Sequence, residues 1–268
     1  MNSWTRKSIE LANQRNYLDL LYKVYPMSIN LRREIDEETS YAIEKAYQNR
    51  NNKELLKLLL QQEVFPIKDS YVAYLKRDTS AVDRNPNTVE RLTGMLYEMG
   101  LDEIFEKATA PKETNRQLGP MFKDWLDKGT LGCKVTRNED EFLNYEGNII
   151  LNSSDMAMKE FASKYLGYKR NKGLDFIGKF NNTIVIAEAK FLSDFGGHQN
   201  AQFDDAISTM KSEINPFYKN YHIKQISILD GVLYIKSKNK MHTRICSEFT
   251  NDEVIISSVL LRDYLYSL

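Results

Sequence analysis

The 268-residue sequence contains only two cysteines, Cys133 and Cys246. Two are too few for a disulfide framework or a cysteine-based zinc cluster, so we expect both thiols to be reduced. No apolar run approaches the roughly 18 residues of a membrane span, and the first residues lack the apolar core of a secretory signal. The sequence has no internal repeat and no low-complexity segment. These absences predict a globular protein of the bacterial or archaeal cytoplasm, with no membrane segment.

The chain also lacks an excess of either charge, since 37 lysine and arginine residues balance 37 aspartate and glutamate residues. A protein that coats DNA nonspecifically is usually basic, whereas a site-specific enzyme can keep its positive charge local. Local basic clusters do occur, at residues 169–172 and 236–240. The zero net charge therefore argues neither for nor against a nucleic-acid partner.

The first half of the chain carries apolar residues at helical spacing. This pattern predicts a mainly helical region over residues 1–145, with helices over 4–25, 29–48, 53–62 and 87–100. The stretch 129–147 is polar and rich in turn residues, and it marks the expected boundary with a second domain over 146–268.

The second half alternates between strand and helix patterns. A hairpin over 174–191 is predicted by two apolar runs joined by an Asn181-Asn182 turn. A second hairpin is expected around Asp230-Gly231, and the remaining elements are a strand over 148–151, a helix from Ser154 to Gly167, a helix over 199–214, and a closing strand or helix over 254–268. The order indicates an α/β fold in which a mixed β-sheet is flanked by helices.

The predicted hairpin over 174–191 ends in charged residues. Asp175 begins the first apolar run, and Glu188-Ala189-Lys190 ends the second. Alternate residues of a strand share a face, so the Glu188 and Lys190 side chains point the same way. A hard cation held by Asp175 and Glu188, with Lys190 beside an attacking water, explains charges at the end of an apolar strand. The alternative is an ordinary exposed Glu–Lys pair.

This pattern resembles the motif of the PD-(D/E)xK nuclease superfamily, in which an acid is followed after ten to twenty residues by Glu-x-Lys at the end of the next strand. Glu188-Ala189-Lys190 is the only acid-x-Lys triplet in the chain. The segment Ile-Ala-Glu-Ala-Lys and the Gly-Gly-His-Gln segment that follows it look most like those of EcoRI-type restriction endonucleases. Leu174 stands where the motif name has proline, a position that varies in such enzymes.

The resemblance implies a restriction-endonuclease-like core that hydrolyses phosphodiester bonds. Mg²⁺ is expected on Asp175, one oxygen of Glu188 and the Ala189 carbonyl, and Lys190 is expected to orient or deprotonate the attacking water. A further acid is often present on the preceding helix of this superfamily. Glu160 is the candidate and Asp155 its competitor.

Contacts with double-stranded DNA are expected on both sides of this motif. Gln199 and Gln202 lie one helical turn apart and are candidates for the scissile phosphate or base edges, and Lys172 is a candidate phosphate contact. Asn115 and Arg116 are residue types that make bidentate base contacts. Each of them has the alternative of a plain polar surface residue, and the lone His198 is not expected to be catalytic.

We therefore expect a Mg²⁺-dependent type II restriction endonuclease that cuts duplex DNA at a short sequence. The helical region 1–145 would serve recognition or dimerisation, and one catalytic set per chain suggests a two-fold symmetric homodimer. A monomer that nicks the strands in turn is the competing arrangement. Rival functions are another nuclease of this superfamily (a repair nicking enzyme, a resolvase or a transposition nuclease), a catalytically silent DNA-binding protein, and a helical interaction module.

Overall fold

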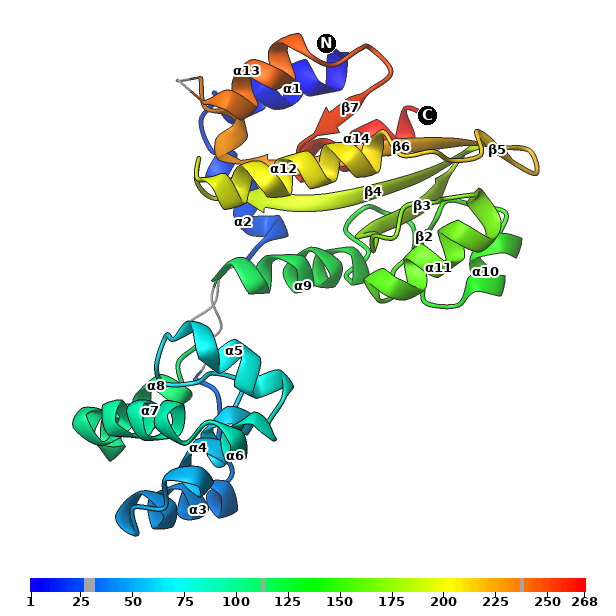
Figure 1. The fold of residues 1–268 in the computed structure, drawn as a ribbon. Coiled ribbons are helices and arrows are strands. Elements are labelled where there is room, and N and C mark those ends of the chain that lie inside the picture. The colour runs from blue at the N-terminus through cyan, green and yellow to red at the C-terminus, as the bar shows by residue number, and fades with distance from the viewer. Residues whose placement is uncertain (27–31, 112–113, 237–238) are drawn as a thin grey trace. The chain divides into compact units, whose positions relative to one another are not determined.

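The computed structural model describes residues 1–26, 32–111, 114–236 and 239–268. The chain divides into two compact units (Figure 1): unit 1 is Met1–Met27 with Thr114–Leu268, and unit 2 is Ser28–Glu113. This division differs from the expected boundary near residue 145, because the first two helices and the segment that follows residue 113 pack with the sheet. Among the described residues, no helix combines the length and the apolar character that a membrane crossing requires.

The described part of unit 2 contains helices and loops but no strand. Its helices are α3 (Glu37–Gln48), α4 (Asn52–Gln61), α5 (Ser70–Arg77), α6 (Ala81–Arg84), α7 (Pro86–Met99) and α8 (Leu101–Ala108). The leucines of α4 form the centre of its own hydrophobic core, where Leu55, Leu56 and Leu59 have no solvent exposure. The apolar stripe of this helix is therefore core and offers no surface to a partner.

In its described residues, unit 1 is built on one mixed sheet of seven strands. They are β1 (Lys134–Thr136), β2 (Ile149–Leu151), β3 (Phe176–Phe180), β4 (Thr183–Leu192), β5 (Phe217–Tyr218), β6 (Tyr221–Gly231) and β7 (Val254–Ile256). The strand order is β1-β2-β3-β4-β6-β5, and β7 also pairs with β6. β2, β3 and β4 are antiparallel neighbours, whereas β4 and β6 run parallel. The predicted α/β class with a mixed sheet is confirmed.

Helices cover both faces of this sheet, with α12 lying along β4 in Figure 1. The helices of unit 1 are α1 (Ser3–Ala12), α2 (Tyr17–Val24), α9 (Thr114–Asp127), α10 (Glu139–Asn144), α11 (Asp155–Leu166), α12 (Gly197–Met210), α13 (Lys240–Ser247) and α14 (Leu261–Tyr266). The single helix expected over 4–25 is two helices, because Asn16 adopts a left-handed conformation with φ of 70°. The expected helix from Ser154 to Gly167 is confirmed as α11.

Alternation along β4 separates the two cores of unit 1. Ile184 and Ile186 pack with α10 and α11, whereas Val185 and Ala187 pack in the larger core with α9 and α12. The turn before β4 follows the expected Asn181-Asn182, and Asn181 takes the left-handed φ of 50° that such hairpin turns require. The predicted hairpin is confirmed, and it supplies the strand that carries Glu188 and Lys190.

The hairpin expected at Asp230-Gly231 is wrong. β6 runs through both residues, and Val232–Tyr234 forms a 3-10 helix. Gly231 has φ of 99°, and a Cβ atom there would lie 2.1 Å from the Leu192 carbonyl oxygen at the end of β4. Glycine is required for this close approach of two strands and not for a turn.

Asp230 itself is a buried anchor. Its carboxylate accepts hydrogen bonds from the hydroxyls of Tyr25 at 3.0 Å and Ser257 at 2.6 Å, and from the Ser258 amide at 3.3 Å. Tyr17 lies at 3.5 Å. Burial raises the pKa of the Asp230 carboxyl, although these donors act in the opposite direction. The network joins α2, the end of β6 and the segment after β7.

Removal of the Asp230 carboxylate should destabilise unit 1. We expect Asp230→Ala to lower the free energy of unfolding by about 3 kcal/mol, because several buried donors lose their acceptor. Both tryptophans, Trp4 and Trp125, lie in unit 1, so their fluorescence during urea unfolding reports on this unit. The exposed Asp252→Ala should change stability by less than about 0.5 kcal/mol. Equal stability of the two variants would contradict the anchoring role.

Candidate active site

Three charged residues from two chain segments meet at the carboxyl-terminal end of β4. Asp175 precedes β3, and its amide donates to the Ala187 carbonyl at 3.0 Å. Its carboxylate Oδ2 reaches two residues further along β4 and accepts from the Ala189 amide at 2.8 Å. Glu188 and Lys190 continue the face of β4 that carries Ile184 and Ile186. The hairpin thus brings the three sequence-predicted residues together.

Three oxygen atoms converge on the ammonium group of Lys190. Its Nζ lies 3.0 Å from Asp175 Oδ2 and 2.9 Å from Glu188 Oε1. The same nitrogen donates to the Ala189 carbonyl oxygen at 3.1 Å. The carboxylates and the carbonyl therefore form one concentrated patch of negative charge around the Lys190 ammonium.

Burial sets the electrostatics of this group. It raises the pKa of Asp175, because desolvation of the carboxylate outweighs the attraction of Lys190 and the Ala189 amide bond. For Lys190, burial favours the neutral amine, but the Asp175 and Glu188 carboxylates outweigh it and raise the pKa of the ammonium. In this structure Lys190 is accordingly a cation.

Glu188 is completely buried, and its two carboxylate oxygens differ in their partners. Oε2 accepts a hydrogen bond from the Thr209 hydroxyl at 2.7 Å. Oε1 receives no hydrogen bond from the described residues, although it lies close to Lys190 Nζ and 3.6 Å from Lys172 Nζ. A buried carboxylate oxygen is costly without a charged or hydrogen-bonding partner, and the partner of Oε1 in this structure is the Lys190 ammonium at 2.9 Å.

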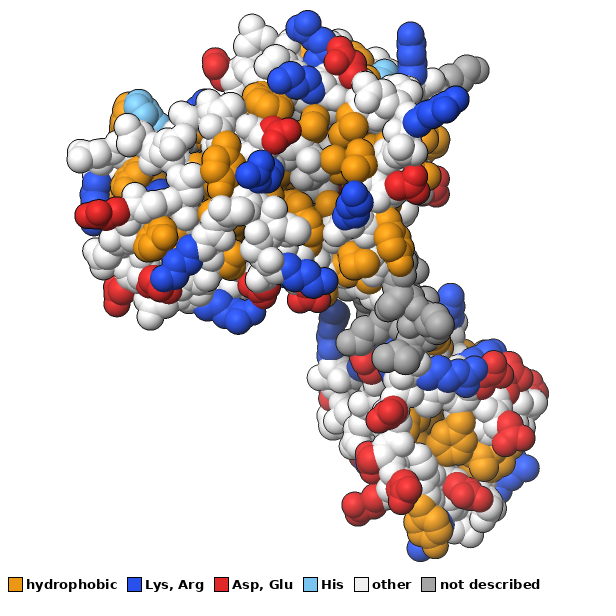
Figure 2. Space-filling model, turned by 180° about the vertical axis from the view of Figure 1, so that it is seen from behind, with side chains coloured by type: hydrophobic (Ala, Val, Ile, Leu, Met, Phe, Trp, Pro, Cys, Tyr) orange, Lys and Arg blue, Asp and Glu red, His pale blue; other side chains and the backbone are white. Residues whose placement is uncertain are grey.

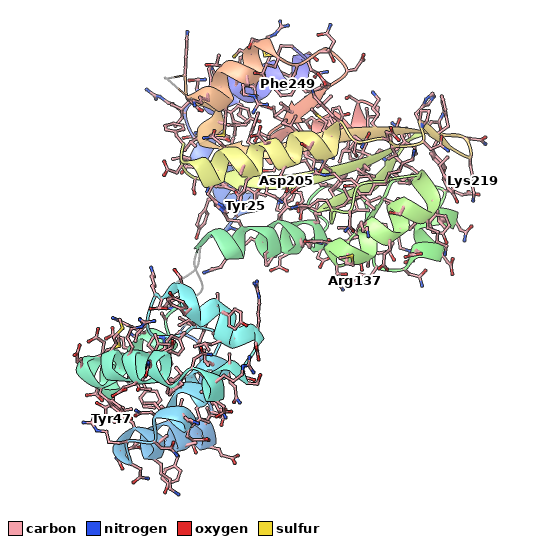
Figure 3. All side chains as sticks on the ribbon, in the orientation of Figure 1. Tyr25, Tyr47, Arg137, Asp205, Lys219 and Phe249 are labelled. Atoms are coloured by element: carbon pink, nitrogen blue, oxygen red, sulfur yellow. The ribbon has the colours of Figure 1, made fainter. Side chains whose placement is uncertain are left out.

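Side chains behind Glu188 form a polar layer that the sequence did not reveal. Asp205, labelled on α12 in Figure 3, pairs with Lys172 at 2.5 Å and with Arg170. Arg170 also donates to the Thr209 hydroxyl at 2.5 Å. Asp205 and Thr209 lie four residues apart on one face of α12. This spacing is visible in the sequence, but the sequence does not indicate which strand that face of the helix contacts.

The two candidate auxiliary acids lie in different surroundings. Asp155, at the start of α11, lines a hollow of about 260 Å³ together with Asp175 and Lys190. It also lines an adjoining hollow of about 550 Å³ with Asp175 and Lys123, and it pairs with Lys123 at 2.6 Å. Glu160 is exposed and lines neither hollow. The geometry favours Asp155 over Glu160.

The residues that were expected to contact DNA lie in different surroundings. Gln202 lines the smaller hollow with Lys190 and Asp155. Gln199 is buried, and both ends of its amide bond to Ser193, so it holds the loop before α12. Lys172 is half-buried against Asp205 and Glu188, as described above. Asn115 and Arg116 belong to the first turn of α9, but their side chains lie outside the described residues.

The donor set fits a hard cation, although it is small. Oxygen atoms of Asp175, Glu188 and Ala189 lie within 3.1 Å of one point of positive charge, and Mg²⁺ prefers such oxygen ligands with water completing the shell. In the described part of the chain, no three aspartate, glutamate, histidine or cysteine side chains form a metal-binding group. A cation here depends on two carboxylates and a backbone carbonyl.

Comparison with known families gives one that matches almost the whole chain. The Tsp45I type II restriction enzyme family matches residues 2–268. The chain belongs to this family. It is a site-specific deoxyribonuclease of a restriction–modification system, and the convergence of Asp175, Glu188 and Lys190 is consistent with the PD-(D/E)xK superfamily. Neither the curated proteins nor the solved structures contain a match to this restriction enzyme.

The approach of the 172–174 segment to α11 brings Asp155 toward Asp175, and it depends on Gly173. A Cβ atom at Gly173 would lie 2.7 Å from Asp155 Cβ, whereas one at Gly197 would have no neighbour within 4 Å. We expect Gly173→Ala to destabilise the restriction enzyme by about 1–3 kcal/mol in urea unfolding, because the backbone has to shift. Gly197→Ala serves as the control and should be close to neutral. No loss of stability in Gly173→Ala would contradict the tight approach.

Proposed function

We propose that Asp175, Glu188 and Lys190 are the catalytic residues of this restriction endonuclease. The observation that carries the proposal is the convergence of Asp175 Oδ2, Glu188 Oε1 and the Ala189 carbonyl on one cationic nitrogen. An ordinary surface ion pair does not fit, because Glu188 is completely buried and the Asp175 side chain is only 13% exposed. Buried groups of both signs are typical of a functional site.

We propose Mg²⁺ as the cofactor, held by Asp175, Glu188 Oε1 and the Ala189 carbonyl. When bound, it would supply positive charge against the scissile phosphate and make water a stronger nucleophile. The residues of the chain do the rest. Lys190 Nζ, with up to three N–H donors, orients the attacking water and stabilises the negative charge that develops on the phosphate.

Asp155 is the proposed auxiliary acid, with Glu160 as the alternative. Asp155 shares two hollows with Asp175, and its pair with Lys123 keeps it at the side of the site. Gln202 is a proposed DNA contact, since it lines one of these hollows. Gln199, Lys172, Asn115 and Arg116 stay as DNA-contact proposals, although bonds within the protein occupy Gln199 and Lys172 in this structure.

Replacement of Asp175, Glu188 or Lys190 by alanine should lower the rate of plasmid cleavage in Mg²⁺ by on the order of 10²–10⁴-fold. Each single replacement should cause a loss of this size, because residues that act as a unit do not contribute additively. Asp155→Ala should lose more activity than Glu160→Ala. Lys224→Ala, an exposed lysine of β6, is the matched control for Lys190 and should cleave like wild type. Digest rates are measured with Mg²⁺, Mn²⁺, Ca²⁺ and EDTA.

Several outcomes would contradict this assignment. Near-wild-type cleavage by Glu188→Ala or Lys190→Ala would remove these residues from the chemistry, and undiminished cleavage in EDTA would remove the metal. Discrete plasmid fragments are expected from a restriction enzyme. Random nicking would favour a different nuclease activity of the same superfamily, and binding without cleavage would favour a silent DNA-binding protein.

We propose that the enzyme acts as a homodimer in the cytoplasm. The chain carries one proposed catalytic set, and two strands of opposite polarity require two. Unit 2 has 13 lysine and arginine residues against 16 aspartate and glutamate residues, a balance that favours protein contact over phosphate contact. Acidic and basic side chains are interspersed over the visible face of each unit (Figure 2), without one extended basic surface there. The apolar residues of α4 and α14 are largely intrachain core.

Sedimentation of the protein with and without DNA tests the dimer. In Ca²⁺, which should support binding without rapid cleavage, two chains are expected on each duplex site. Glu188→Ala in Mg²⁺ gives an independent complex that cannot cut. One chain per duplex site in both complexes would mean that a monomer nicks the strands in turn.

A further inference from the structure

The Thr209 hydroxyl lies between three polar groups behind Glu188. It is 2.7 Å from Glu188 Oε2, 3.1 Å from the Asp205 carbonyl and 2.5 Å from Arg170 Nη1. Thr209 is almost completely buried, so water does not compete for these bonds. All three neighbours belong to unit 1.

The chemistry of these groups fixes the direction of each bond. The Arg170 guanidinium can only donate, so the Thr209 oxygen is the acceptor there. The single hydroxyl proton is then left for the two oxygen atoms, and the charged carboxylate at the shorter distance is the stronger acceptor. Arg170 is itself held by the Asp205 carbonyl at 2.6 Å and by the Asp205 carboxylate. The hydroxyl is therefore oriented toward Glu188 Oε2.

This bond distinguishes the two oxygens of Glu188. With Oε2 committed to Thr209, Oε1 is the oxygen that faces Lys190 and Asp175. Without the hydroxyl, Oε2 loses the donor that the structure gives it, and the ion pairs of Oε1 with Lys190 and Lys172 are left to resist rotation of the carboxylate about its last side-chain bond. A fixed rotamer at this position fixes the geometry of the whole oxygen cluster.

We infer that Thr209 is a positioning residue that holds Glu188 Oε2 so that only Oε1 is presented to the catalytic cation. Arg170 and Asp205 orient the hydroxyl from behind. The inference rests on the proposed role of Glu188 as a metal ligand. Loss of a partner of this kind, which holds a metal ligand without touching the metal, commonly lowers metal affinity or activity by about 10–100-fold.

The test compares three variants of α12 in the full chain. Thr209→Val removes the hydroxyl and keeps the shape, Thr209→Ser keeps the hydroxyl, and Ser208→Ala removes an exposed hydroxyl that bonds only to the Asp204 carbonyl. Mn²⁺ binding is measured by the loss of the free-ion EPR signal, and the Mg²⁺ dependence of plasmid cleavage is measured in parallel. Urea unfolding shows whether each variant is folded.

Thr209→Val should weaken Mn²⁺ binding by about 10–100-fold and raise the Mg²⁺ concentration for half-maximal cleavage by a similar factor. Thr209→Ser should stay within about threefold of wild type, and Ser208→Ala should match wild type. If the valine variant does not fold, Thr209→Ala is used, because it places no methyl group against the carboxylate.

Two results would overturn the inference. They are unchanged Mn²⁺ binding in the folded variant that lacks the hydroxyl, and equal weakening in Thr209→Ser. Glu188→Ala separates this failure from that of the proposed function. If the wild type binds Mn²⁺ and Glu188→Ala binds it equally well, Glu188 is not a ligand and the proposed site itself is wrong.

Discussion

The candidate site at the end of β4 depends on a carboxylate, that of Glu188, which has no access to solvent. Burial of an ionised group costs several kcal/mol unless charges and hydrogen bonds compensate for it. Around Glu188 the compensation comes from the Lys190 ammonium at 2.9 Å, the Thr209 hydroxyl at 2.7 Å and the more distant Lys172. These partners belong to β4, α12 and the segment before β3, so the charge ties together the elements that form the site.

A second buried acid, Asp230, holds the end of the neighbouring strand β6. Asp230 lies opposite Phe191 in the parallel pairing of β4 and β6, and its hydrogen bonds gather Tyr25 and Ser257 around the end of β6. Tyr25 also lines the hollow beside Lys190. Two buried carboxylates, one with hydroxyl and amide donors and one with cations, thus fix the ends of neighbouring strands. Glu188 Oε1 has the Lys190 ammonium as its partner instead of a hydroxyl or an amide, and an oxygen that already pairs with a cation suits a metal ion.

Local pattern predicted the parts of the fold that local forces determine. The Asn181-Asn182 turn between two apolar runs predicted the hairpin that unites Asp175, Glu188 and Lys190. Ser154 and Gly167 predicted the limits of α11. Long-range packing decided the rest. The Asp-Gly at 230–231 has the composition of a turn, but the carboxylate is a buried acceptor and the glycine allows contact with Leu192. Thr209 could not be assigned, because only the tertiary structure sets α12 against Glu188.

The central claim is that Asp175, Glu188 Oε1 and the Ala189 carbonyl hold the catalytic divalent cation. A crystal structure of the Lys190→Ala variant with duplex DNA and Mn²⁺, with anomalous scattering recorded at the manganese edge, tests it most directly. The account predicts an anomalous peak at about 2–2.3 Å from all three oxygens, with Glu188 bound through Oε1 alone. A peak that touches neither Glu188 nor the Ala189 carbonyl would contradict the account.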